Sequence, residues 1–76
     1  MEIKVLGSGC AKCHEVERII RQAVAEAGVS AEVTHVTDVK EIARHGVFQT
    51  PAVVVDGVVK SVGKIPAKAD VLSWLN

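Results

Sequence analysis

The sequence predicts one α/β domain with the element order β-α-β-α-β-β-α, in which a four-stranded mixed sheet carries helices on both faces. Apolar residues alternate or form short runs in some segments, as in strands, and recur every three or four residues in others, as in amphipathic helices. Glycine or proline separates these segments. With 76 residues there is room for a single domain, which we place at residues 1–76.

The first strand and the first helix are expected on either side of a glycine-rich loop. Ile3, Val5 and Leu6 make an apolar run that stops at Gly7-Ser8-Gly9, which predicts a buried strand over residues 2–6. Behind the loop the apolar residues take helical spacing, polar residues fill the other faces, and Gly28 ends the helix. The apolar positions of this helix are Val16, Ile19, Ile20, Ala23, Val24 and Ala27.

A second strand and a short second helix follow. Residues 29–36 have a strand-like composition, with apolar and polar residues alternating from Val29. Asp38, with Glu41 three residues later, forms the pattern of a capping box. We therefore expect a short helix that runs through His45 and is closed by Gly46.

The last third of the chain predicts a hairpin and a final helix. Pro51 precedes the apolar run of residues 52–55, which is typical of a strand buried on both faces. Asp56-Gly57 is a strong hairpin signal and leads into a strand over residues 58–62. Pro66 is then expected in the first turn of the last helix. That helix carries Val71, Leu72, Trp74 and Leu75.

The order of these elements predicts the direction and the position of the strands in the sheet. A helix joins the first two strands, so they should lie parallel through a right-handed crossover, whereas the last two form an antiparallel hairpin. The strands over residues 2–6 and 52–56, which contain the apolar runs, belong in the centre of the sheet, and the mixed strands belong at its edges.

Composition excludes several classes of function. Nine basic residues balance nine acidic ones, and Phe48 and Trp74 are the only aromatic residues, which argues against nucleic acid as a partner. The longest apolar run, Ala52 to Val55, is far shorter than the roughly 20 residues of a membrane span. The first residues do not resemble a signal peptide. We therefore expect a cytoplasmic protein that does not bind membranes, and a monomer.

The chemistry is expected at Cys10-Ala11-Lys12-Cys13. The pair lies where the first strand ends and the first helix begins, and there unpaired backbone N–H groups and the helix dipole stabilise a thiolate. Cys10, at the start of the first turn, is the expected nucleophile, with a pKa below the roughly 8.5 of an ordinary thiol. Cys13, one turn later, is the expected resolving thiol. Lys12 and His14 are candidates for tuning the thiolate pKa.

Together these features resemble the thioredoxin fold in its compact form, and in particular the small glutaredoxin-like redox-active disulfide proteins. The resemblance covers nearly the whole chain. It implies a thiol–disulfide oxidoreductase without a cofactor, acting on disulfides of protein or small-molecule partners and fed by an upstream thiol or flavin-dependent reductase. It also implies that Pro51 is a cis proline facing the cysteine pair, that Thr50 pairs with a substrate strand, and that Gly63 approaches the substrate.

Two departures from the family pattern bear on the partner. Gly9 precedes the cysteine pair, and Ala11 and Lys12 stand between the thiols, unlike the sequences of thioredoxins or glutaredoxins proper. The acidic residue that glutaredoxins carry soon after the glycine matched by Gly63 is replaced by Lys64. The sequence therefore does not predict glutathione as the specific substrate.

Alternative uses of the cysteines remain open. The loop also resembles heavy-metal-associated domains that carry Cu(I) or another soft metal between two thiolates, although their β-α-β-β-α-β order differs. The C-x-x-C-H spacing with His14 matches a haem attachment motif, but the valine-rich strands do not suit a haem protein. His35 and His45 lack the spacing of zinc ligands and are expected at the surface or an edge.

The two aromatic residues are first interpreted as packing residues. Trp74 is expected to pack in the last helix. Phe48, just before Thr50-Pro51, is expected to plug the core, and bordering the substrate groove is its alternative role.

Overall fold

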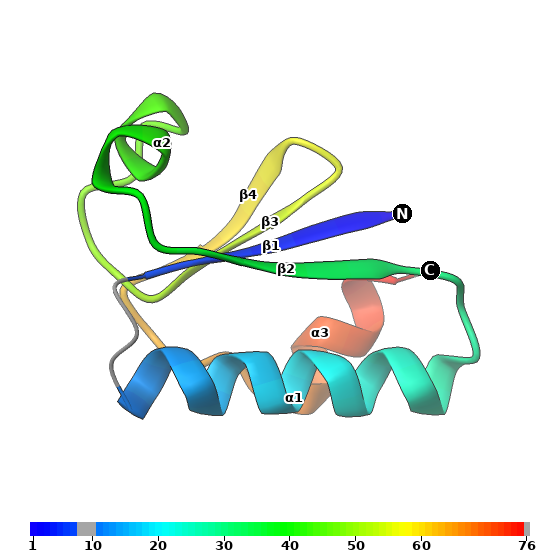
Figure 1. The fold of residues 1–76 in the computed structure, drawn as a ribbon. Coiled ribbons are helices and arrows are strands. Elements are labelled where there is room, and N and C mark those ends of the chain that lie inside the picture. The colour runs from blue at the N-terminus through cyan, green and yellow to red at the C-terminus, as the bar shows by residue number, and fades with distance from the viewer. Residues whose placement is uncertain (8–10, 76) are drawn as a thin grey trace.

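The computed structural model describes residues 1–7 and 11–75, and within them the elements follow the predicted order (Figure 1). Cys10 lies outside these residues. The strands are β1 (Glu2–Leu6), β2 (Glu32–Val36), β3 (Ala52–Val55) and β4 (Val58–Val62), and the helices are α1 (Ala11–Ala27), α2 (Val39–Arg44) and α3 (Lys68–Trp74).

The sheet has the strand order β2-β1-β3-β4. β1 runs parallel to β2 and antiparallel to β3, and β3 runs antiparallel to β4. β1 and β3 therefore lie in the centre, as predicted, where neighbours on both sides satisfy their backbone groups.

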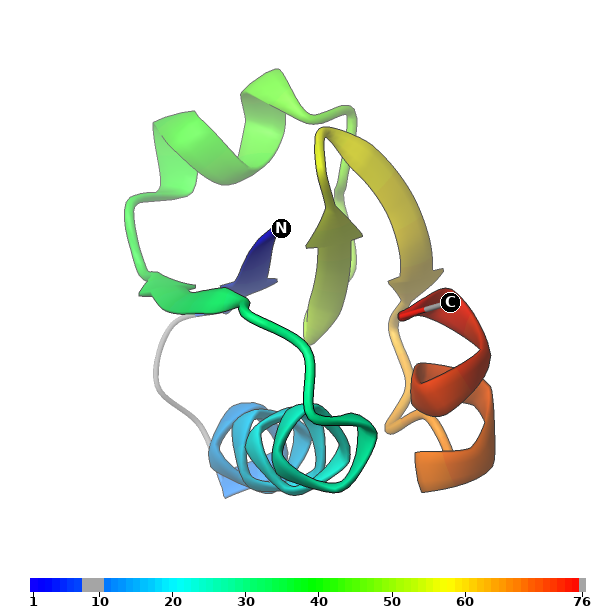
Figure 2. The same cartoon turned by 90° about the vertical axis from the view of Figure 1, so that its right-hand side faces the viewer.

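The helices cover the two faces of the sheet unequally. α1 and α3 lie side by side on one face, and α2 lies on the other (Figures 1 and 2). β3 contributes to both resulting cores, because Val53 and Val55 pack toward α1 and α3 whereas Ala52 and Val54 pack toward α2. The prediction of a strand buried on both faces is thus confirmed. Trp74 packs against the first of these cores, also as predicted.

Two predicted boundaries are wrong. β2 begins at Glu32 and not at residue 29, because its first partner is Glu2 and β1 extends no further back. The alternation that starts at Val29 nevertheless holds, since Val29 and Ala31 pack against the core from outside the strand. α3 begins at Lys68, so Pro66 lies before the helix and not in its first turn.

The physical reason for the second boundary lies in the cap of α3. The carbonyl oxygen of Ala67 accepts the N–H groups of Asp70 and Val71, at 3.0 and 3.2 Å, and so closes the first turn. Pro66 is buried just ahead of this cap.

Two local signals are confirmed. Asp38 caps α2 with its carboxylate, which accepts the N–H of Lys40 at 2.9 Å. Asp56 and Gly57 both have positive φ, +48° and +84°, as a tight hairpin turn between β3 and β4 requires. The Asp56 carboxylate also accepts the N–H of Glu2 at 2.8 Å, which ties this turn to the start of β1.

Candidate active site

The candidate site is built where β1 ends, where α1 begins and where the chain enters β3. Cys13 lies in the first turn of α1 and is fully buried. Its sulfur packs on the Cα of Gly7, the residue that follows β1. A Cβ at position 7 would overlap the Cys13 Sγ and lie 3.3 Å from the Cys13 Cβ. Glycine therefore makes the room in which the thiol sits.

Thr50 also lies close to Gly7. The position that a Cβ on Gly7 would take lies 3.8 Å from the Thr50 Cβ, so Gly7, Cys13 and Thr50 meet at one point. The Thr50–Pro51 peptide bond is cis. Thr50 is exposed and Pro51 is buried, so the threonine is the part of this turn that a partner can reach.

Gly63, the residue after β4, joins the group through Pro51. Its N–H donates to the Pro51 carbonyl oxygen at 2.8 Å. The Gln49 side chain lies across it, with Oε1 only 2.6 Å from where a Cβ would stand. Gly63 has a φ of +72°, which favours glycine. The structure thus brings together four predicted site residues: Cys13, Thr50, Pro51 and Gly63.

The two candidates for tuning the thiolate lie beside Cys13 on α1. Lys12 and His14 are both exposed in the first turn. The His14 ring meets the ring of His35 edge to face, with the centroids 5.9 Å apart and the planes at 80°. This contact places an imidazole pair next to the first turn of the helix.

His35 and His45 are both partly shielded from solvent. His35 lies on the edge strand β2 as expected, but its Nε2 is shielded from solvent and has no hydrogen-bond partner within the part of the chain that the structure describes. His45 follows α2 with a side chain that is only 19% exposed, and its Nε2 lies 3.9 Å from Glu41. Packing against α1 and α2, respectively, explains why neither ring is a simple surface group.

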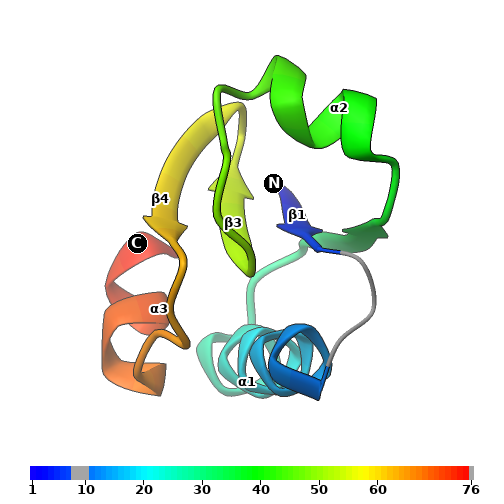
Figure 3. The same ribbon diagram turned by 90° about the vertical axis from the view of Figure 1, so that its left-hand side faces the viewer.

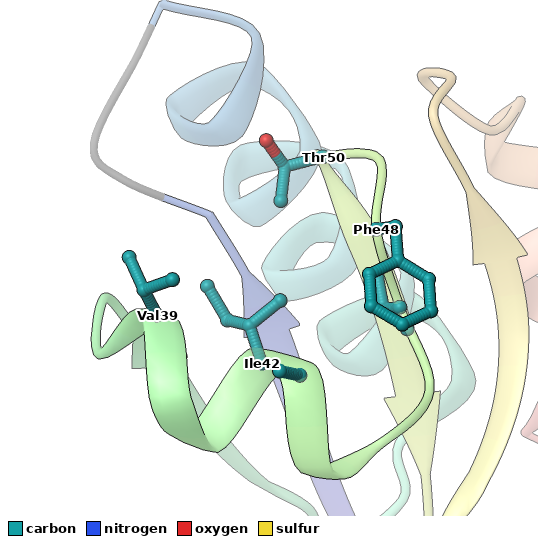
Figure 4. Close-up of a pocket in the computed structure, with 6 residues that line it drawn as sticks. Val39, Ile42, Phe48 and Thr50 are labelled. Atoms are coloured by element: carbon teal, nitrogen blue, oxygen red, sulfur yellow. The ribbon is translucent and has the colours of Figure 1, made fainter.

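Phe48 does not plug the core, because 87% of its surface is exposed. Val47, one residue earlier, fills the core position under α2 instead. Phe48 lines an open pocket of about 240 Å³ between α2 and the loop that leads to β3 (Figure 4). Figure 3 shows how α2 and this loop lie on one side of the sheet. The lining residues are Val39, Ile42, Ala43, Val47, Phe48 and Thr50.

The sequence did not point to the pocket or to Gly7. Helical spacing assigns Ile42 to a buried face of α2, but it says nothing of which loop will lie opposite. The one available signal was Phe48 itself, a large apolar residue two positions before Thr50. Gly7 could be interpreted only as part of a tight loop, since its contact with Cys13 depends on how α1 docks on β1.

The ion pair between Glu15 and Arg18 on α1 shifts the pKa of both side chains. The Arg18 side chain donates hydrogen bonds to the Glu15 carboxylate, which hold the pKa of Glu15 below its usual value and raise that of Arg18. Both side chains are exposed, so solvent screens the pair and it contributes little to stability.

Within residues 1–7 and 11–75, no group of three or more histidine, cysteine or acidic side chains is placed to hold a metal ion. No helix in those residues is long and apolar enough to cross a membrane.

Cys13 is thus buried in the first turn of α1, and the cis Thr50–Pro51 peptide bond lies just before β3. A family model described as a thioredoxin domain matches residues 1–76. The chain belongs to the thioredoxin family. This assignment confirms the predicted fold and places the protein among thiol–disulfide oxidoreductases, whose members act on disulfide-containing proteins.

Two curated members of the thioredoxin family are similar over most of their length. A protein named thioredoxin from Methanocaldococcus jannaschii is 44% identical over 69 residues, covering 91% of this chain and 79% of the relative. A second protein of that name, from Methanothermobacter thermautotrophicus, is 34% identical over 76 residues, covering 100% of this chain and 99% of the relative.

Proposed function

We propose that this protein reduces disulfides of client proteins with the dithiol of Cys10 and Cys13. The observation that supports this most is the place of Cys13, which is buried in the first turn of α1 against Gly7, close to which Thr50 also lies. A thiol placed there is shielded from solvent but lies beside an exposed residue that a client can contact. Membership of the thioredoxin family supports the same chemistry.

The proposed reaction has two exchange steps. The Cys10 thiolate attacks one sulfur of the client disulfide, a mixed disulfide forms, and the other client sulfur leaves as a thiolate that takes up a proton. Cys13 then loses its proton to solvent and attacks the Cys10 sulfur as a thiolate; it displaces the second client thiolate, which takes up a proton from solvent. The client gains two electrons and two protons, and the protein is left with a Cys10–Cys13 disulfide.

Burial of Cys13 suits the second step. A buried thiol favours its neutral form, which keeps Cys13 from competing with Cys10 for the client disulfide. Cys13 reacts once the mixed disulfide brings an electrophilic sulfur beside it. Lys12 and His14 are proposed to favour the Cys10 thiolate through their positive charge, His14 only when it is protonated.

Thr50, Pro51 and Gly63 are proposed to hold the client. Proline has no backbone N–H, and the exposed Thr50 beside it offers its backbone to an extended client segment, as a strand edge does. Gly63 has no side chain that would block the client, although the side chain of Gln49 lies across Gly63.

We propose that an upstream thiol or flavin-dependent reductase regenerates the dithiol and that no bound cofactor takes part. A reducing compartment such as the cytoplasm fits this cycle. The metal-carrier alternative has lost support, because α2 separates β2 from β3 and α3 follows β4, which is not the order of those domains.

Thiol counting tests the proposal. The fully reduced protein is mixed with a disulfide-bridged protein client, and thiols are counted on both partners after separation. The proposal expects two protein thiols to be lost for every client disulfide reduced, with turnover abolished in both Cys10→Ser and Cys13→Ser. A wild-type protein that leaves the client disulfide intact would refute it. Stoichiometric retention of Cu(I) against a chelator would favour the metal carrier.

A further inference from the structure

The charged side chains are distributed unevenly along the sheet, although their formal sum is zero. One end of the molecule, here called the site end, comprises the ends of β1 and β2, the start of α1, the helix α2, and the loops before β3 and after β4 (Figure 1). At the site end, cationic side chains outnumber anionic ones. They are Lys12, Lys40, Arg44 and Lys64 against Asp38 and Glu41.

The opposite end, here called the far end, has the reverse balance. It comprises the starts of β1 and β2, the turn between β3 and β4, and the last turn of α1 with the start of α3 beside it. Its two lysines are both held in ion pairs, at 3.8 and 2.6 Å from their carboxylate partners. The protein is therefore an electric dipole whose positive end is the redox site. The side chains of the far end are Glu2, Glu26, Glu32, Asp56 and Asp70 against Lys4 and Lys68.

Three of the cations at the site end lie beside residues of the candidate active site. Lys12 belongs to the first turn of α1, which holds the buried thiol. Lys64 follows Gly63 directly. Lys40 belongs to the first turn of α2, the helix that lines a pocket together with Thr50.

These three lysines are exposed and are not neutralised by ion pairs. Within residues 1–7 and 11–75, the ion pairs at the site end join Glu41 to Arg44 and His45 and involve none of the three. The Asp38 carboxylate caps α2 by accepting the backbone N–H of Lys40. The three ammonium groups are therefore available to the carboxylates of a partner.

We propose that the site end binds an acidic segment of the client protein, next to the client disulfide, through Lys12, Lys40 and Lys64. The inference deepens the proposed function and rests on it. It names the client class as proteins with acidic residues near the disulfide. The redox step is unchanged: the client disulfide takes up two electrons and two protons, and the Cys10–Cys13 disulfide forms.

The positions of the lysines favour a protein segment over a small anion. Lys12 and Lys40 belong to helices on opposite faces of the sheet, and Lys64 follows the edge strand β4. One small anion cannot contact helices on both faces at once. An extended segment advances about 3.3 Å per residue, so its successive carboxylates can approach more than one lysine.

The expected benefit is faster and better oriented association. Exposed charges attract an oppositely charged partner before contact, and this raises the association rate more than it lengthens the life of the complex. Salt screens the attraction, with a Debye length of about 30 Å at 0.01 M and about 3 Å at 1 M. A preference for acidic clients should therefore depend on ionic strength.

Matched peptides test the inference. Each peptide has the same disulfide-closed ring, flanked on both sides by glutamates, by glutamines or by lysines. The dithiol supplies two electrons for each reduction, and the peptide thiolates take up two protons from solvent. Each rate constant is divided by that for dithiothreitol, which corrects for the effect of the flanking charges on the disulfide itself. The corrected rate constant should be about tenfold higher for the glutamate than for the lysine peptide at about 0.01 M salt, and nearly equal at 1 M.

Three variants locate the preference. At about 0.15 M salt, where the Debye length is about 8 Å, Lys64→Glu and Lys40→Glu should each lower the glutamate-to-lysine ratio about threefold or more. Both side chains are exposed, so neither change removes core packing. Lys60→Glu is the matched control, because it reverses the charge of an exposed lysine inside β4, further from the site. It should keep most of the ratio. Lys12 stays unchanged in this series, since it is also proposed to favour the Cys10 thiolate.

The outcomes separate this inference from the proposed function. A wild-type ratio near 1 at low salt, or a ratio that salt leaves unchanged, would overturn the inference. So would a ratio that survives in both site-end variants, or one that Lys60→Glu lowers as much as they do. Oxidised glutathione, corrected in the same way, should be reduced more slowly than the glutamate peptide, and faster reduction would assign the lysines to a small anion and overturn the inference. If the reduced wild-type protein reduces none of these disulfides, the proposed redox function itself fails.

Discussion

The contact between Gly7 and Cys13 can be tested by Gly7→Ala. Gly7 is fully packed and its φ is outside the left-handed region, so alanine meets no backbone strain there. The new Cβ would overlap the Cys13 Sγ and would also approach the Cys13 Cβ to 3.3 Å. Overpacking of this kind costs about 1–3 kcal/mol of unfolding free energy, because the sulfur or the backbone must move.

The same change in a Cys13→Ala background isolates the sulfur. With Sγ removed, the closest neighbour of the new Cβ is the Cβ of residue 13 at 3.3 Å, which needs only a small adjustment. A glycine-to-alanine change at a compatible site stabilises a protein by about 0.4–1 kcal/mol through the unfolded chain. We therefore expect Gly7→Ala to be close to neutral in this background and clearly destabilising in the wild type.

Urea unfolding of the four reduced proteins measures this cycle. A domain of this size is expected to unfold in one step, with a slope of about 1 kcal/mol per molar urea. The coupling free energy should be about 1 kcal/mol or more. Gly7→Ala should therefore lower the urea midpoint by about 1 M in the wild type and by much less in the Cys13→Ala background. Equal costs of Gly7→Ala in the two backgrounds would refute the placement of the Cys13 sulfur on Gly7.

Three further predictions concern the fold. Asp56→Ala should lower the unfolding free energy by about 1–2 kcal/mol in urea titrations, because it removes the acceptor for the Glu2 N–H and places alanine at positive φ. Asp56→Asn should lower the unfolding free energy by less. Asp38→Ala should cost about 1 kcal/mol through loss of the α2 cap, and Asp38→Ser should restore most of that loss, whereas equal unfolding of all three proteins would contradict the cap. Arg18 lowers the pKa of Glu15 in the folded protein. The pair therefore stabilises the fold at pH values above the ordinary pKa of a glutamate, and this stabilisation is lost as the pH falls through the lowered pKa of the folded state. Arg18→Gln should therefore return the Glu15 pKa, followed by NMR titration, toward its ordinary value, and the small stability difference from wild type should vanish in acid.

Local signals were sufficient to predict most of the fold. The apolar run of residues 52–55 needed only its composition to be placed in the centre of the sheet, and Asp56-Gly57 fixed the hairpin by the backbone angles it permits. Boundaries that depend on a distant partner could not be predicted in this way. β2 starts where β1 gives it a partner, and α3 starts where the Ala67 carbonyl closes the first turn.

In the candidate site, too, some residues could be predicted from local signals, whereas others depend on how distant elements pack. Cys13, Thr50 and Pro51 could be recognised from motif and resemblance, because their residue types are demanded by the chemistry. Phe48 was misplaced, since its apolar character predicts burial and cannot show that Val47 takes the core position. The contact of Gly7 with Cys13 arises only when α1 docks on the end of β1.

The most direct test of the proposed function is the trapping of mixed disulfides by the two single-cysteine variants. Cys13→Ser keeps the proposed nucleophile but removes the thiol that releases the client, so covalent complexes with disulfide-containing clients should accumulate on non-reducing gels and disappear on reduction. Cys10→Ser, whose remaining thiol is buried, should trap far fewer. Equal trapping by the two variants, or none by either, would contradict the roles of Cys10 as nucleophile and Cys13 as resolving thiol.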